Sequence, residues 1–199
     1  MQPTPASGAR LTPNVSCHPL NARTRLTAYR QFIVAAALCV FAPLGVAADY
    51  QWIPRLEGRV TDVANVLSSA DRESLAGLLA RYERETSHQI GVLLIPTLSG
   101  ESIESFSLRV ANSWKLGQKG LDNGILVTLA MKERSVRIEL GLRMERFISN
   151  AAAQSIINNS MVPAFRKGDY AGGLHAGLEQ LMSEGRKFVV TPAELQRAR

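Results

Sequence analysis

Cysteine and histidine are scarce in this chain of 199 residues, and their positions exclude several kinds of chemistry. Cys17 and Cys39 both lie in the first 48 residues, so the remainder can form neither a disulfide nor a catalytic thiol. That remainder contains only two histidines, His88 and His175. Because His88 follows a predicted helix end, where the helix dipole favours a cation, we expect it to cap that helix. Two histidines without cysteine fall short of a zinc site unless carboxylates join them. The stability of this part must therefore come from packing.

Recognisable catalytic and nucleic-acid-binding motifs are also missing. The sequence contains no P-loop, no Cys-x5-Arg arrangement and no paired-His phosphatase motif. It has no basic patch interleaved with aromatic residues, so we expect no nucleic-acid partner. Its acidic residues do not have the spacing of a calcium-binding loop.

The start of the chain has the pattern of a signal peptide. Residues 31–48 are uncharged and rich in apolar residues, follow several arginines, and end in small residues. Cleavage after Ala48 would leave Asp49 as the first residue of a periplasmic or secreted protein. The alternative is an uncleaved N-terminal anchor in the inner membrane, but Pro43, Gly45 and a length near the lower limit of a membrane span favour cleavage.

The predicted boundaries give three segments. Residues 1–48 form a disordered leader plus signal peptide, residues 49–185 form one α/β domain, and residues 186–199 form a flexible C-terminal tail. The leader contains four arginines and no acidic residue, so the rest has 19 basic and 17 acidic residues and a net charge of only +2. This balance does not demand an acidic partner.

Two adjacent segments carry the clearest strand pattern. Residues 125–131 are almost entirely apolar, as expected of a central strand covered on both faces by helices. Residues 136–141 instead alternate between apolar residues and the charged Arg137 and Glu139, which must face the other way. The short turn between them predicts a hairpin.

Amphipathic helices are predicted before and after this hairpin. Their caps are Ser68, Ser102, Asn150 and Asp169. A short apolar strand at 90–95 separates the first two helices, and residues 58–62 contribute an edge segment. The element order predicts a mixed β-sheet sandwiched by helices, of the α/β class.

Seven short segments between about residues 58 and 182 follow one another in a characteristic order. They are residues 60–67, 89–92, 102–104, 114–120, 122–126, 136–141 and 163–174. In order and spacing they resemble the TPM domain family, which is named after thylakoid-lumen, photosystem-repair and nematode receptor-associated members. The resemblance implies a three-layer α/β sandwich that is exported or faces a lumen and is often membrane-associated. Members have been assigned acid phosphatase activity, divalent metal binding, or accessory roles in membrane complexes.

One loop departs from the family pattern. Relatives commonly follow the second hairpin strand with Gly-Leu-Glu-Gly and then a Thr-Asp pair, whereas this chain has Gly141-Leu-Arg-Met and ends the loop at Asn150. An anion or metal pocket built from this loop is therefore expected to be reduced or absent. We also expect this chain to lack the Gly-rich tail and the C-terminal membrane span that many relatives carry.

The resemblance also supplies candidate site residues. Asp62 and Asp122 would be catalytic, Lys119, Asn123 and Arg137 would bind substrate, and Asp62, Asp122 and Glu139 would hold calcium or magnesium. Carboxylates that converge at strand ends suit such hard cations. The structural alternative is that Asp62 caps a turn, the Asp122-Asn-Gly turn needs a positive φ, Lys119 is solvated, and Glu139 pairs with an arginine.

Three functions remain compatible with the sequence. The preferred hypothesis is an exported binding or accessory protein that supports a membrane-associated complex through an unknown protein partner. The alternatives are a metal-assisted acid phosphatase and a structural calcium-binding domain.

Overall fold

The computed structural model describes residues 52–197, and the predicted leader and signal peptide lie outside this range. The elements, in chain order, are β1 (Val60–Asp62), α2 (Ser69–Thr86), β2 (Gln89–Ile95), α3 (Ile103–Trp114), β3 (Gly124–Ala130), β4 (Ser135–Leu140), α4 (Leu142–Glu145), α5 (Asn150–Ile156), the π-helix η1 (Ile157–Met161), α6 (Val162–Phe165), α7 (Tyr170–Gly185), the 3₁₀ helix η2 (Arg186–Phe188) and α8 (Pro192–Arg197).

The four strands form one mixed sheet in the order β1-β2-β3-β4. The first three strands are parallel, and β4 returns antiparallel to β3 through the predicted hairpin. Strand β3 is buried along its whole length, whereas β4 is less enclosed. These patterns confirm the predicted central strand and the predicted alternating strand.

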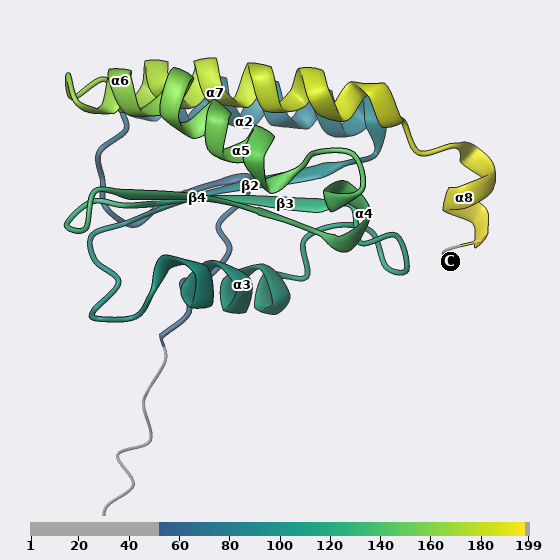
Figure 1. The fold of residues 1–199 in the computed structure, drawn as a ribbon, viewed down its shortest axis with the longest axis horizontal. Helices are drawn as coiled ribbons and strands as arrows, with labels where there is room; N and C mark the ends of the chain where they lie inside the picture. Colours follow the sequence, from purple (N-terminus) through teal and green to yellow (C-terminus); the bar gives the residue numbers. More distant parts are fainter. Residues whose placement is uncertain (1–51, 198–199) are drawn as a thin grey trace, which may run out of the picture. The chain divides into compact units, whose positions relative to one another are not determined.

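Helices cover both faces of the sheet. Helices α2, α5, α6 and α7 lie over one face, and α3 crosses the other (Figure 1). Leu75 and Leu79 of α2 are fully buried against the first face, and Phe106 and Val110 of α3 are buried against the second. The three-layer α/β architecture is therefore as predicted.

The helix caps follow the sequence with one exception. Ser68 and Asp71 form a reciprocal capping box at the start of α2, and Ser102 caps α3 through the Ser105 N–H. Ser149, not Asn150, caps α5, because its hydroxyl accepts from the Ala152 N–H. The predicted Asn150 cap is wrong by one residue, since serine is an equally good cap.

The C-terminal segment packs against the domain, where we had expected a flexible tail. Phe188 stacks on Phe147 with ring centroids 3.8 Å apart, and the Val190 N–H donates to the Thr86 carbonyl at 3.3 Å. Glu194 of α8 pairs with Arg143 at 2.6 Å. Sequence polarity alone does not show these contacts, because each depends on a partner at least 40 residues away.

Candidate functional site

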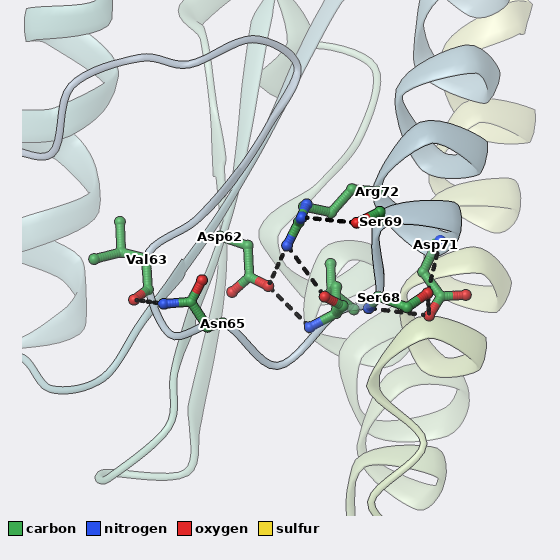
Figure 2. A network of polar contacts seen from close by, with 8 residues as sticks. Asp62, Val63, Asn65, Ser68, Ser69, Asp71 and Arg72 are labelled. Carbon is green, nitrogen blue, oxygen red and sulfur yellow. Dashed lines mark hydrogen bonds and ion pairs between the residues drawn. The ribbon is translucent and has the colours of Figure 1, made fainter.

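Asp62 lies at the carboxyl end of β1, where the chain turns toward α2. Its side chain is fully buried, and Oδ2 accepts a hydrogen bond of 2.8 Å from the Leu67 N–H (Figure 2). The same oxygen lies 3.8 Å from Arg72 Nη1. Asp62 therefore holds the β1–α2 loop in place, which is the turn-capping role given above as the structural alternative.

The other Asp62 oxygen, Oδ1, is buried without a hydrogen-bond partner among the described residues. Asp62 is one of the residues that line a pocket of about 390 Å³, whose lining carries both signs of charge and includes Arg59, Arg72 and Glu73. Arg59 is held by Glu83 at 2.7 Å. The charges in the lining of this pocket therefore largely balance.

Asp122 lies at the opposite end of the sheet from Asp62. The parallel register aligns Asp62 with Leu94 and Leu94 with Leu129, whereas Asp122 precedes Gly124 at the amino end of β3. At about 3.3 Å per residue, Leu129, which is level with Asp62, lies roughly 16 Å along β3 from Gly124. The expectation that Asp62 and Asp122 converge is therefore wrong. Asp62 ends β1 whereas Asp122 precedes β3, so the parallel strands place the two residues at opposite strand ends.

Asn123 holds the loop before β3 rather than projecting into an open site. Its side chain is completely buried. Its Oδ1 accepts from the Gln118 N–H at 2.7 Å, and its Nδ2 donates to the Ser87 carbonyl at 2.7 Å. Asp122 beside it has a φ of 48°, as the turn alternative requires, and Lys119 is exposed on the same loop. Both ends of the Asn123 amide are thus used in internal contacts.

Arg137 and Glu139 form an ion pair on the α3 side of β4. Arg137 Nε donates to Glu139 Oε2 at 3.0 Å, and both side chains are partly buried. The predicted alternative of an arginine pair for Glu139 is confirmed. Arg137 therefore already has an anionic partner, in the place where a substrate phosphate was expected.

The predicted cation ligands do not form one site. Within residues 52–197, no group of three or more His, Cys, Asp and Glu side chains is placed to hold a metal ion. Asp62 is excluded from a site with Asp122 and Glu139 by the strand register. A cation shared by Asp62, Asp122 and Glu139 thus does not fit this arrangement.

Two of the predicted residues do meet in a groove between α3, the end of β4 and α4. The groove has a volume of about 240 Å³ and is lined by Asp122 and Glu139 together with Glu145. Leu108 of α3 and Leu142 of α4 also line it, and they are 52% and 72% exposed. The groove therefore combines three carboxylates with two unusually exposed leucines.

Three of these groove residues, Leu108, Leu142 and Glu145, are not predicted from the sequence, although the helical pattern indicates an exposed position for Leu108. Leu108 stands outside the apolar stripe of its helix, so an exposed position was readable from the helical period. Leu142 and Glu145 fall in a short helix after Gly141, where no periodic face is defined. Only the tertiary structure, which brings residues of α3 and α4 to one groove, shows that they belong together.

His88 follows the end of α2 and is buried. Its position predicts instead an imidazolium that caps the helix and interacts with the helix dipole. The side chain is fully enclosed, and its Nδ1 lies 3.2 Å from the Tyr82 hydroxyl. Burial, and then the positive charge of Arg143, lower the pKa of His88. The predicted capping role is wrong, because the chain turns inward here through Ser87 in the left-handed region.

Comparison with known proteins shows that the chain matches one family model and is similar to several solved domains. The family model of the TPM domain matches residues 60–184. The N-terminal domain of a protein from P. gingivalis is 33% identical with a TM-score of 0.58, covering 63% of this chain and 80% of that domain. Comparison with curated proteins found no match.

Two further solution structures show the same fold at lower identity. The BA42 protein from the psychrophilic bacterium Bizionia argentinensis is 20% identical with a TM-score of 0.56, covering 64% of this chain and 88% of that protein. The N-terminal domain of the cg2496 protein from Corynebacterium glutamicum is 20% identical with a TM-score of 0.52, covering 67% and 87%. Within the described part of the chain, no helix has both the length and the apolar content to cross a bilayer.

Proposed function

Because this chain belongs to the TPM domain family, we propose that it is an exported, non-catalytic member that acts as a binding or accessory protein for a membrane-associated complex. The groove between α3 and β4 is the proposed contact site. The observation that carries this proposal is the exposure of Leu108 and Leu142 in its lining.

Exposed leucines beside a groove are more informative than scattered apolar residues on a surface. Large apolar side chains tend to remain exposed where a partner covers them, and protein interfaces centre on a few such groups in a pocket. Leu142 is the most exposed large apolar side chain among the residues whose burial the structure describes. Its position beside three carboxylates suits a contact with both apolar and polar parts.

The placement of the candidate catalytic residues also supports a binding role. Phosphoryl transfer requires a nucleophile or activated water and cationic donors around one reacting phosphorus. Asp62 and Asp122 lie at opposite ends of the sheet, and Arg137 is paired with Glu139. These residues do not surround a common point.

A phosphatase assay tests the proposal against its enzymatic alternative. The protein purified after expression of the full chain is incubated with a generic aryl phosphate across pH, with and without calcium or magnesium. We expect no turnover above that of a sample denatured beforehand. Robust turnover that Asp62→Ala or Asp122→Ala abolishes, and that the exposed-surface control Glu179→Ala retains, would establish the metal-assisted acid phosphatase instead.

Calcium or magnesium binding in a structural role is the remaining alternative. Isothermal titration calorimetry with each ion alone separates it from the binding proposal. A stoichiometric heat that Asp122→Asn removes would favour the cation-binding domain.

Export is tested separately from binding. We expect fractionation of cells expressing the full chain to recover it outside the cytoplasm, with Asp49 as its first residue by N-terminal sequencing. Intact polypeptide retained in the membrane fraction would instead support the N-terminal anchor.

A further inference from the structure

The ionisable residues that line the α3–β4 groove all carry negative charge at neutral pH. They are Asp122, Glu139 and Glu145, and no lysine, arginine or histidine joins them. Two arginines close in sequence to these acids are already engaged, Arg137 by Glu139 and Arg143 by Glu194. Arg146 and Lys119 are exposed and do not line the groove. Among the described residues, Asp122 and Glu145 make no ion pair, so two carboxylates remain available to a positively charged ligand.

The size of the groove limits what that ligand can be. Its volume of about 240 Å³ lies below the range of roughly 300–1,000 Å³ typical of pockets for small organic ligands. A groove of this size suits one long side chain better than a whole cofactor. The chemistry of the lining selects a side chain with an apolar stem and a cationic end.

The two leucines fit the stem of such a side chain. Leu108 of α3 and Leu142 of α4 both line the groove, together with Asp122 from the loop before β3 and Glu139 from β4. Lysine and arginine side chains pack their methylene groups on apolar surface while their charged ends meet polar groups. The arrangement therefore matches one basic side chain inserted between the leucines.

Strand β4 beside the groove is an edge strand of the sheet, since β3 is its only strand partner within residues 52–197. The Gly141 N–H donates to the Gly124 carbonyl, so by alternation the N–H groups of Ile138 and Leu140 point away from β3. Such an edge can pair with an extended segment from another protein. An extended partner running along β4 would pass beside the groove.

We propose that this groove binds an extended segment of a partner protein by taking up one lysine or arginine side chain flanked by apolar residues. This inference rests on the proposed binding function and specifies the chemistry of the partner. The carboxylates of Asp122 and Glu145 receive the cation, and Leu108 and Leu142 contact the stem and the flanking residues.

The test uses fluorescence anisotropy with the purified full-chain protein and three short labelled peptides. The peptides alternate valine and leucine with polar residues and differ only at the centre, which is arginine, norleucine or glutamate. We expect the arginine peptide to bind at least tenfold more tightly than the other two. Its affinity should fall as salt is raised, because the contact is partly exposed.

Matched variants locate the contact. Glu145→Gln and Asp122→Asn should each weaken the arginine peptide about five- to tenfold without affecting the norleucine peptide, and Leu142→Ser should weaken both. Glu179→Gln and Leu56→Ser change an exposed acid and an exposed leucine outside the groove lining and should leave binding unchanged. Circular dichroism of each variant confirms that it is folded.

Several outcomes would overturn the inference. Equal affinity for the arginine and norleucine peptides would show that the groove does not bind the cationic side chain. The same conclusion would follow if neither Glu145→Gln nor Asp122→Asn weakened binding. Self-association that Leu142→Ser abolishes would assign the groove to a second copy of the chain. If no peptide binds and the phosphatase assay is also negative, this inference fails while the proposed accessory function stands, whereas phosphatase turnover rejects that function itself.

Discussion

Asn123 illustrates how residues with potential chemistry serve the backbone in this protein. One buried amide joins the Ser87 carbonyl to the Gln118 N–H, and so connects the end of α2 to the loop before β3. Asp62 does the same for the β1–α2 loop through the Leu67 N–H. In both cases the polar side chain satisfies a main-chain group that would otherwise be buried without a partner.

His88 should make the stability of the protein depend on pH. Its pKa in the folded state is lowered from the ordinary value of 6.5, so below about pH 6.5 the unfolded chain takes up a proton that the folded chain resists. The free energy of unfolding should therefore decrease as pH falls from about 6.5 toward the lower folded-state pKa. Urea unfolding at a series of pH values measures this slope.

The variant His88→Gln should flatten that slope, because glutamine does not titrate but can still form a hydrogen bond with the Tyr82 hydroxyl. His175→Gln is the control, since His175 lies on α7, is partly exposed and contacts Ser74 instead. A slope that His175→Gln removes and His88→Gln retains would contradict the assignment.

At the scale of elements, α7 packs closely against η1 because glycine occupies the contact. A Cβ atom on Gly177 would collide with Met161, which is completely buried. A Cβ atom on Gly77 in α2 would meet no other atom within 4 Å. The two helical glycines are thus opposite in their packing although alike in sequence context.

Two alanine substitutions should separate helix propensity from packing. Gly77→Ala should raise the free energy of unfolding by about 0.5–1 kcal/mol, because alanine is the better helix former. Gly177→Ala should lower it by about 1–3 kcal/mol, because the buried Met161 must be displaced. Equal stabilisation by both, measured by urea unfolding, would show that α7 and η1 are less closely packed than the structure indicates.

The C-terminal segment should detach in acid before the domain unfolds. Hydrogen bonds from Arg143, and then from the backbone and side chain of Thr191, lower the pKa of Glu194 to about 2. The contribution of the Arg143–Glu194 pair is therefore complete above about pH 4.5 and is lost as pH falls toward 2. Hydrogen exchange of residues 190–197 should accelerate over this range.

The variant Glu194→Gln should accelerate the same exchange at neutral pH. Glu184→Gln is the matched control, because its pair with Lys187 is largely exposed and lies within the chain segment around η2. Acceleration caused by Glu184→Gln alone would show that the Arg143 pair does not hold α8.

At the scale of the whole molecule, the sheet separates the two acids that the sequence suggested should act together. Asp62→Ala should cost about 1–3 kcal/mol of unfolding free energy, because it leaves the Leu67 N–H without its partner. Asp122→Ala should cost about 1 kcal/mol, because alanine is poorly suited to a φ of 48°. Since the sites are far apart, the double variant should equal the sum within about 0.5 kcal/mol.

Denaturant unfolding of the two single variants and the double variant completes this cycle. A coupling energy above about 1 kcal/mol would mean that Asp62 and Asp122 share contacts. That result would contradict the register of β1, β2 and β3.

Much of the architecture could be predicted from local pattern. The alternation around Arg137 and Glu139 marked β4 and its hairpin, and the apolar run after Gly124 marked a doubly covered strand. The candidate site was predicted only in part: Asp122 and Glu139 do line one groove, but Asp62 does not join them. Matching acids along a chain does not reveal which end of a parallel strand each one occupies.

The sequence by itself determined the order of the four strands and of the helices α2, α3, α5 and α7, the nearly neutral balance of charge after residue 48, and the absence of thiol chemistry there, because these follow from residue type and from spacing along the chain. Tertiary structure alone decided that Asp62 stands apart from Asp122, that Leu108 and Leu142 border one acidic groove, and that α8 docks on Arg143. Those outcomes depend on strand register and on how helices pack across a sheet. Both are set by contacts between residues distant in the chain, which local periodicity does not encode.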